Sequence, residues 1–285
     1  MKVYEKNSSV FLEDTENFDI KQTFTCGQCF RFHEYDNGFF EGVAFGKYLG
    51  ISQIGNLVVI HNCTLEEFES TWKPFFDLDT DYGMISKSLS KDGIMKKAID
   101  FGGGIRILKQ DMFECIVSFI ISQNNSIYNI ERVVERICEK YGTEIGVYNG
   151  KTRYSFPTPE QLSKATVDEL TELKCGYRAD YITGFTNAVV KGDFDIEDLS
   201  HIDTEAAKDK LLSVKGIGNK VADCILLFGY HKFDVFPTDV WVKKAMADLY
   251  SVDVKNIDSF SNDYFGKYRG LAQQYLFYYK RSGEK

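Results

Sequence analysis

The sequence predicts an α+β fold, in which an antiparallel β domain over residues 1–77 precedes a mostly helical domain over residues 78–285. Residues 18–62 form short runs rich in aromatic and β-branched residues, separated by Gly and Asn, which is typical of antiparallel strands. From Thr64 onward the apolar residues recur instead at helical spacing. Because the strands precede the helices as a block, the pattern excludes the alternating strands and helices of a parallel sheet.

The expected elements follow in chain order. Strands are expected over residues 18–24, 29–35, 38–46, 47–53 and 56–62. Thr64, with Glu67 three residues later, predicts a capping box for a helix over 65–72. Further helices are expected over 82–89, 93–101, 112–121, 127–141, 159–164, 167–173, 179–191 and 205–214.

Composition and targeting signals narrow the class of protein. The 285 residues are 44% hydrophobic and 15% aromatic, which is enough to bury a sizeable core. The most apolar stretch, residues 113–121, contains Glu114 and is far shorter than the roughly 20 apolar residues of a membrane span. The first residues include Lys2 and Glu5 where a signal peptide would be apolar. We therefore expect a cytoplasmic protein with no membrane partner.

The net charge of −8 at first argues against a polyanionic partner. The acidity is local, however, because residues 1–77 contain twelve acidic and six basic residues, and the segment from Tyr264 to the C-terminus is basic. Such segregation leaves room for a basic face, so nucleic-acid binding remains possible.

The cysteines do not predict a metal site or a disulfide framework. There are seven, an odd and scattered set that is typical of free thiols in a reducing compartment. Only Cys26 and Cys29 are close in sequence, and neither zinc-ligand spacing nor an iron–sulfur run accompanies them. We expect no metal among the site residues and no required cofactor.

The strongest local signal is a helix-hairpin-helix pattern at about residues 205–229. A helix ends near Val214, the turn Lys215-Gly216-Ile217-Gly218 follows, and a second helix runs from Asn219, as its cap, to Phe228 before Gly229 stops it. The glycines allow a close backbone approach, and the amides at the start of the second helix favour an anion such as phosphate. Alone, this pattern is more often an ordinary interhelical turn.

Three residues in and after this pattern suggest chemistry. Lys220 and Cys224 are four apart and hence share a helix face, and Asp239 follows a Phe-Pro-Thr turn as the expected cap of another helix. A Lys in the first turn of a helix lies where the helix dipole disfavours its cation, so Lys220 could serve as an amine nucleophile. Each residue also has a simpler interpretation: a phosphate contact for Lys220, a core residue for Cys224 and a mere cap for Asp239.

Longer matches decide between these interpretations. The segment 211–239, with GIGNKVADC and the FPTD sequence that ends nineteen residues beyond Lys220, resembles the helix-hairpin-helix DNA glycosylases and, within them, the 8-oxoguanine DNA glycosylases. Further blocks match in the family's order and cover most of the chain. They are Gly27-Gln28-Cys29-Phe30-Arg31, Ser118-Phe119-Ile120 followed by Asn124-Asn125, Cys175-Gly176-Tyr177-Arg178-Ala179, and Ala272-Gln273 with Phe277.

The resemblance implies a bifunctional DNA N-glycosylase and AP lyase of base excision repair, of the bacterial type. Lys220 matches the lysine that attacks the anomeric carbon of the damaged nucleotide, and Asp239 matches the carboxylate that stabilises the sugar cation. The Schiff base that forms then permits β-elimination. The implied partner is duplex DNA containing 8-oxoguanine, bound by a monomer at the nucleoid. A monovalent ion at the carbonyls of residues 215–218 is also implied.

The resemblance further implies two sets of binding residues. The flipped-out base is held by Gly27, Cys224, Gln273 and Phe277, and the carbonyl of Gly27 accepts the N7 hydrogen that guanine lacks. The DNA is contacted by Asn124, Tyr177, Arg178, Gly216, Gly218 and Val221. From spacing alone, Gln273 and Phe277 share one helix face, where a solvated amide and a core ring are the simpler interpretation.

Two positions depart from the family. Asn129 stands where the family has an Arg five residues after the Asn matching Asn124, and Trp241 replaces a phosphate-contacting His of animal and plant relatives. Two other functions also remain open. One is a glycosylase for an oxidised pyrimidine or alkylated purine, against which Gly27, Gln273 and Phe277 argue. The other is a non-catalytic protein whose hairpin only binds phosphate.

Overall fold

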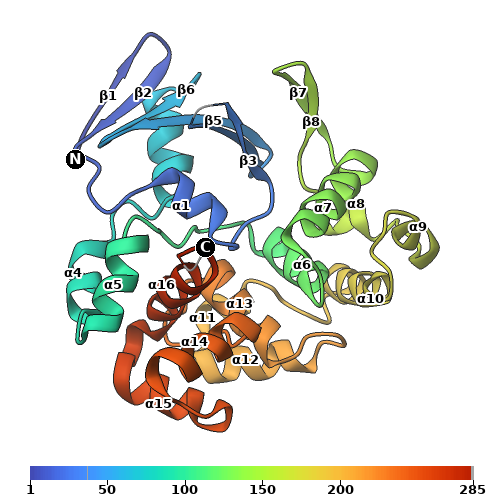
Figure 1. The fold of residues 1–285 in the computed structure, drawn as a ribbon. Coiled ribbons are helices and arrows are strands. Elements are labelled where there is room, and N and C mark those ends of the chain that lie inside the picture. The colour runs from blue at the N-terminus through green and yellow to red at the C-terminus, as the bar shows by residue number, and fades with distance from the viewer. Residues whose placement is uncertain (37, 284–285) are drawn as a thin grey trace. The chain divides into compact units, whose positions relative to one another are not determined.

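The computed structural model describes residues 1–36 and 38–283; Asn37, Glu284 and Lys285, the last two within the basic C-terminal segment, lie outside it. The chain divides into two compact units (Figure 1). The first unit comprises residues 1–28, 52–109 and 226–285, and the second comprises residues 29–51 and 110–225. The predicted α+β class is confirmed, because a sheet near the N-terminus precedes a mostly helical remainder. The boundary at residue 77 stays a prediction.

The described strands form one larger sheet and one hairpin. The strands of the larger sheet are β1 (Lys2–Lys6), β2 (Ser9–Glu13), β3 (Phe32–Asp36), β4 (Phe39–Ala44), β5 (Lys47–Ile54) and β6 (Leu57–His61). Their order is β1-β2-β6-β5-β4-β3, and β1 with β2, β2 with β6, and β3 with β4 pair antiparallel. Strands β7 (Glu144–Tyr148) and β8 (Lys151–Tyr154) pair as a separate antiparallel hairpin.

Alternating burial explains the register of β2 with β6. Val10 and Leu12 are buried on β2, and Val58 and Ile60 are buried on β6. The register places Val10 opposite Ile60 and Leu12 opposite Val58, so all four side chains lie on one face of the sheet. A slip by one residue would expose all four, which is why this register is strongly specified.

The helices of the first unit come from all three of its stretches of chain. They are α1 (Ile20–Thr25), α2 (Leu65–Glu67), the π-helix η1 (Phe68–Trp72), α3 (Lys73–Phe75), α4 (Tyr82–Leu89), α5 (Gly93–Gly102), α14 (Val240–Tyr250), the 3-10 turns η2 (Val254–Asn256) and η3 (Gly266–Tyr268), α15 (Ile257–Phe265) and α16 (Arg269–Ser282). Helix α16 packs against α5, α14 and α15 (Figure 1). Residues 270–276 of α16 are all buried, so this helix forms the centre of the unit's helical part.

The second unit is largely helical. Its helices are α6 (Met112–Ser122), α7 (Ile127–Tyr141), α8 (Pro159–Leu162), α9 (Val167–Glu172), α10 (Arg178–Lys191), α11 (Asp198–His201) and α12 (Thr204–Ser213), and α13 (Asn219–Tyr230) begins here and ends in the first unit. Helix α6 is buried from Cys115 to Ile121 and packs against α7 and α10. Helix α7 has a narrower apolar face because its buried residues recur every three to four positions.

Several sequence predictions are wrong. Residues 18–24, predicted as a strand, contain most of α1, because Asp19 accepts a hydrogen bond from the Gln22 amide at 2.8 Å and caps a helix there. Strands β1, β2, β7 and β8 were not predicted. The helix over 65–72 begins at the predicted cap Thr64 but becomes a π-helix at Phe68. Gly229 does not end the second hairpin helix, which continues to Tyr230, and that helix begins with Asn219 itself.

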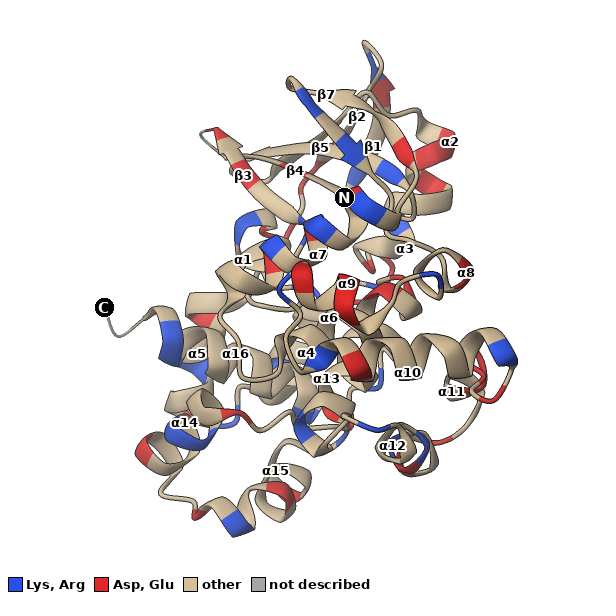
Figure 2. Ribbon diagram, turned by 90° about the vertical axis from the view of Figure 1, so that its right-hand side faces the viewer, with Lys and Arg blue, Asp and Glu red and all other residues tan. Residues whose placement is uncertain are grey.

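Charge is distributed as the sequence suggested for the N-terminal region. Glu66 and Glu67 lie in the first turn of α2, which is red in Figure 2. Carboxylates at a helix N-terminus are favoured by the helix dipole.

Within the described residues, no helix is both long and apolar enough to cross a membrane.

Candidate active site

The predicted hairpin connects α12 and α13 in the second unit. Its turn is closed by a hydrogen bond from the Ile217 amide to the Val214 carbonyl at 3.0 Å. Gly216 has a φ of +92°, and a Cβ at this position would overlap the ring of Tyr181. Gly218 is exposed, and a Cβ there would meet no described atom within 4 Å. Gly216 is therefore required by the fold, whereas Gly218 leaves its backbone open to a ligand.

A salt bridge on the same surface anchors the first residue of the turn. Lys215 Nζ lies 2.7 Å from Asp180 Oδ2, and its ammonium lies 6.0 Å from the ring centroid of Tyr181. Both partners are on α10. Because the pair is exposed, its contribution to stability is small, about 0–1 kcal/mol. Its effect is to hold the Lys215 charge beside the hairpin.

Lys220 lies in the first turn of α13, directly after the hairpin. Its side chain is partly exposed, and its ammonium lies 5.7 Å from the ring centroid of Phe119 on α6. Val221 and Cys224, on the same helix, are both buried. Lys220 and Cys224 share a helix face as the sequence predicted, and Phe119 limits the directions that the amine can take.

The residues predicted to enter the duplex cluster in the second unit. Arg178 donates from Nε to the Gln123 carbonyl at 2.8 Å and from a terminal nitrogen to the Asn124 carbonyl at 3.0 Å. Its guanidinium lies 4.5 Å from the ring centroid of Tyr177, which is 55% exposed. Asn124 is exposed and has a φ of +48°, as expected at a tight turn. The structure therefore brings Asn124, Tyr177 and Arg178 together.

Asp239 belongs to the first unit and caps α14. Its Oδ1 accepts a hydrogen bond from the Val242 amide at 2.8 Å, and its backbone is extended, as expected of an N-cap. The predicted cap is confirmed. One carboxylate oxygen is thereby fixed in position while the side chain stays partly exposed. Trp241, the second departure from the family, is exposed in the first turn of the same helix.

Helix α16 carries Gln273 and Phe277 one helical turn apart. Gln273 is buried, and its Oε1 has no hydrogen-bond partner among the described residues. An unpaired buried acceptor is costly and is seldom found without a functional reason. Phe277 is partly exposed, and the guanidinium of Arg281 lies 5.3 Å from its ring centroid.

Gly27 lies in the turn that follows α1, with a φ of +86°. It is partly exposed, whereas its neighbours Cys26 and Gln28 are buried. The turn adjoins α16, because the Gln274 amide donates to the Cys26 carbonyl at 2.8 Å. Burial raises the pKa of the Cys26 thiol to about 11, and this thiol donates to the Thr23 carbonyl at 3.3 Å. Cys26 is therefore a neutral, structural thiol.

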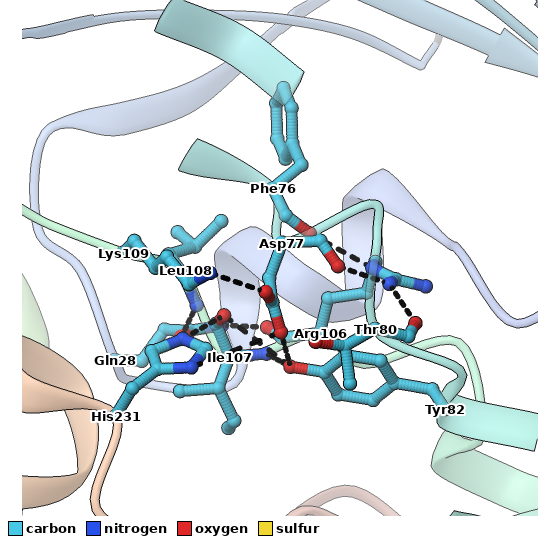
Figure 3. A network of polar contacts seen from close by, with 10 residues as sticks. All are labelled: Gln28, Phe76, Asp77, Thr80, Tyr82, Arg106, Ile107, Leu108, Lys109 and His231. Carbon is cyan, nitrogen blue, oxygen red and sulfur yellow. Dashed lines mark hydrogen bonds and ion pairs between the residues drawn. The ribbon is translucent and has the colours of Figure 1, made fainter. Parts of the chain in front are cut away.

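Next to this turn lies a buried polar network of the first unit (Figure 3). Arg106 donates to the carbonyls of Phe76, Asp77 and Thr80. Tyr82 donates to Asp77 Oδ2 at 3.1 Å and accepts from the Ile107 amide at 3.0 Å. The network fixes residues 106–108, which we call the 106–108 segment. Within residues 1–36 and 38–283, no group of three or more His, Cys, Asp or Glu could hold a metal.

The predicted residues thus fall into two sets. The first unit holds Gly27, Asp239, Gln273 and Phe277, and the second unit holds Asn124, Tyr177, Arg178, Gly216, Gly218, Lys220, Val221 and Cys224. The convergence of Lys220 with Asp239 stays a prediction, because these two residues belong to different units. Sequence reasoning missed Asp180 and Tyr181 beneath the hairpin, and Gln274 beside the Gly27 turn. The positive φ of Gly216 was foreseeable, but its neighbour Tyr181 was not.

Comparisons with known proteins identify the family of the chain. The N-terminal domain of 8-oxoguanine DNA glycosylases matches residues 10–116, and the HhH-GPD superfamily of base excision DNA repair proteins matches residues 117–261. The chain belongs to this superfamily. The family predicted from the hairpin and its companion motifs is therefore confirmed, and the chain also has the N-terminal domain of the 8-oxoguanine branch.

Individual relatives cover most or part of the chain. A probable N-glycosylase/DNA lyase of Methanothermobacter thermautotrophicus is 29% identical over 82% of this chain and 81% of its own length. The N-glycosylase/DNA lyase of Saccharomyces cerevisiae is 38% identical over 52% of this chain and 43% of its own. The Clostridium acetobutylicum 8-oxoguanine glycosylase/lyase, solved with duplex DNA containing cytosine opposite 8-oxoguanine, is 43% identical, covers 100% of this chain and 99% of its own, and has a TM-score of 0.96.

Proposed function

We propose that this protein excises 8-oxoguanine from duplex DNA and then cleaves the strand, with Lys220 as the nucleophile. Lys220 supports this role by its place in the first helical turn behind an exposed hairpin, in a chain of this superfamily. The open backbone at Gly218 and the helix N-terminus bind phosphate and bring the duplex to the amine. The carbonyls of residues 215–218 are also where we propose that a monovalent ion binds.

The chemistry proceeds in two steps. The Lys220 amine forms a bond to C1′ of the damaged nucleotide as the N-glycosidic bond breaks, and the bonding pair leaves with the base, which takes up a proton. The sugar carries positive charge in this transition state, and the Asp239 carboxylate stabilises it. Loss of the amine proton with opening of the sugar ring gives a Schiff base. This acidifies C2′, so removal of a C2′ proton expels the 3′ phosphate by β-elimination.

Recognition of the base rests on the first unit's residues. The damaged base must leave the duplex, which costs a few kcal/mol of unpairing and unstacking. The Gln273 amide offers the base a buried acceptor that has no hydrogen-bond partner in the described part of the chain, and the ring of Phe277 offers a stacking surface. The carbonyl of Gly27 accepts the N7 hydrogen of 8-oxoguanine and faces a lone pair in guanine. Cys224 completes this set from α13.

The second unit's cluster contacts the orphaned base. Asn124, in the turn between α6 and α7, lies beside Arg178 and Tyr177 at the start of α10, and the exposed Asn124 and Tyr177 suit entry into the gap left by the flipped nucleotide. Val221 and the hairpin contact the neighbouring DNA backbone.

We propose that the protein acts on DNA as a monomer, at the nucleoid.

Borohydride trapping tests this function. A duplex with a single 8-oxoguanine opposite cytosine is expected to give a covalent protein–DNA product when borohydride reduces the Schiff base. Matched duplexes carry an oxidised pyrimidine, an alkylated purine or an undamaged guanine. Stronger trapping on another lesion would favour a glycosylase of different specificity, and binding without trapping on any duplex would favour a non-catalytic DNA-binding protein.

A further inference from the structure

We propose that Gln274, together with Gln28, is a positioning residue that fixes the Gly27 carbonyl relative to the base-contacting face of α16. The inference rests on the proposed function, in which Gly27 distinguishes 8-oxoguanine from guanine. It assigns a role to two buried amides that do not themselves touch the base. All residues involved belong to the first unit.

The first contact joins the Gly27 turn to α16. Gln274 is 2% exposed, and its Nε2 donates to the Cys26 carbonyl at 2.8 Å. This carbonyl belongs to the peptide that links Cys26 to Gly27, so the bond fixes the plane directly before Gly27. Gln274 follows Gln273 in the chain. The same helix therefore holds the proposed base contacts and the turn that presents the discriminating carbonyl.

The second contact joins the other side of the turn to the 106–108 segment. Gln28 is fully buried, and its Nε2 donates to the carbonyls of Thr23 at 2.9 Å and Arg106 at 2.7 Å. Its Oε1 accepts from the Leu108 amide at 2.9 Å. Three hydrogen bonds to backbone groups leave this side chain a single orientation, and they fix the residue directly after Gly27.

The segment that Gln28 holds is itself rigid. Arg106 donates to the carbonyls of Phe76 and Thr80, and Tyr82 bonds to the Ile107 amide (Figure 3). Burial raises the pKa of Tyr82 well above its usual value, so the hydroxyl keeps its proton and its bond to Asp77. A third tie comes from Arg281, which donates to the Thr25 carbonyl at 2.8 Å.

The hydrogen bonds of Gln274 and Gln28 on the two sides of Gly27, which together we call the clamp, matter because guanine and 8-oxoguanine differ at only a few atoms. A carbonyl that accepts from the N7 hydrogen of one base and repels the N7 lone pair of the other discriminates only while it stays at hydrogen-bond distance. If the turn relaxes, both the attraction and the repulsion weaken. Loss of the clamp is therefore expected to reduce discrimination, even where the protein remains folded.

The test measures base discrimination without chemistry. In the full chain carrying Lys220→Gln, dissociation constants are measured for duplexes that contain 8-oxoguanine or guanine at one position opposite cytosine. Gln274→Met, which keeps the length but removes the donor, is expected to lower the preference for 8-oxoguanine at least tenfold. Gln274→Asn keeps an amide that is too short for the Cys26 carbonyl, and the same loss is expected.

Gln22→Met is the matched control. Gln22 is another amide that ties α1 to the neighbouring chain, accepting from the Gly104 amide at 2.9 Å and donating to the Phe101 carbonyl at 3.2 Å, but it does not touch the residues flanking Gly27. Its loss is expected to leave the preference unchanged. With Lys220 restored, all variants are expected to cleave a preformed abasic site at the parent rate, because that substrate has no base for the Gly27 carbonyl to contact.

The outcomes separate the two proposals. If the parent itself shows no preference for 8-oxoguanine, the proposed function is wrong. If the parent shows the preference and both Gln274 variants retain it, the positioning role is wrong while the proposed function stands. An equal loss of preference in Gln22→Met would also overturn the positioning role, because the effect would then follow from general loosening of α1.

Discussion

Arg178 donates from its guanidinium Nε to the backbone carbonyl of Gln123 at 2.8 Å, and a terminal nitrogen donates to the Asn124 carbonyl at 3.0 Å. Arg178 is only 8% exposed as a result. To contact an orphaned base, its side chain must release at least one of these hydrogen bonds to the backbone. We therefore expect Arg178 to compensate little for the Arg that the family has at the position of Asn129.

Asn129, in the first turn of α7, is exposed and stands where the family has an Arg. An amide has both a donor and an acceptor end and suits adenine as readily as cytosine. We expect Asn129→Arg to strengthen the preference for 8-oxoguanine opposite cytosine over adenine by about 1 to 3 kcal/mol. Single-turnover rates with each opposite base measure this ratio. Asn129→Gln lengthens the side chain without adding charge and is expected to change this ratio of rates little. If the parent already shows a strong preference for cytosine and Asn129→Arg leaves that preference unaltered, the idea is refuted.

Replacing the nucleophile separates chemistry from binding. Lys220→Gln is expected to abolish base release and borohydride trapping while retaining damaged-duplex binding, because the amides of the hairpin remain. Lys220→Arg keeps the positive charge beside Phe119 but should not sustain Schiff-base chemistry, so it is expected to be equally inactive. Trapping by either variant would show that another amine attacks the sugar.

The negative charge of Asp239 can be removed while the side chain at this position still caps α14. Asn is as good an N-cap as Asp, so Asp239→Asn is expected to preserve α14 while losing the carboxylate that stabilises the sugar cation. Base release should slow by about 100-fold or more, as is typical for the loss of one electrostatic contact in a transition state, with DNA binding retained. Asp203→Asn is the control, since Asp203 caps α12 in the same way. Equal single-turnover rates for parent and Asp239→Asn would reduce Asp239 to a structural role.

The two hairpin glycines are expected to respond differently to the same change. A Cβ at Gly218 would meet no described atom within 4 Å, so Gly218→Val should leave the melting temperature unchanged and weaken binding to damaged and undamaged duplex alike by blocking backbone approach. Gly216→Val should lower the melting temperature, because it combines a φ of +92° with overlap on Tyr181. Thermal unfolding and duplex titration distinguish the two. A loss confined to damaged duplex would place Gly218 in the base pocket instead.

Much of the fold was predictable because its helices carry local signals. Among the described residues, Asp, Ser or Thr side chains cap ten α-helices, including Asp239 at α14, and α4 and α7 have the predicted bounds. Helix α1 was mistaken for a strand because its β-branched and aromatic residues are typical of strands, although Asp19 was a readable cap. The hairpin of β7 and β8 has no strong alternation, since its side chains are mostly half-buried or exposed.

The site residues likewise divide into those that a local sequence pattern predicts and those that only the folded chain brings together. Lys220, Cys224 and Asp239 were found from spacing and motif, because helix geometry relates residues four apart. The bond between Gln274 and Cys26 spans 248 positions, and no local pattern relates these residues. The contact of Gly216 with Tyr181 likewise depends on packing between elements distant in sequence. Supporting residues of this kind emerge only when the chain is folded.

The Oε1 of Gln273, which has no hydrogen-bond partner among the described residues, is expected to lower the stability of the DNA-free protein. A buried acceptor without a donor costs about 1–3 kcal/mol, and a bound base that donates a hydrogen bond recovers this cost. Gln273→Leu is therefore expected to raise the melting temperature by several degrees while abolishing preferential 8-oxoguanine binding, as thermal unfolding and duplex titration would show. A lower melting temperature would mean that the amide already has a structural partner. Under the proposed function, Gln273 lowers the stability of the DNA-free protein and raises its affinity for the flipped base, so selection for thermal robustness alone would remove a residue that we propose for recognition.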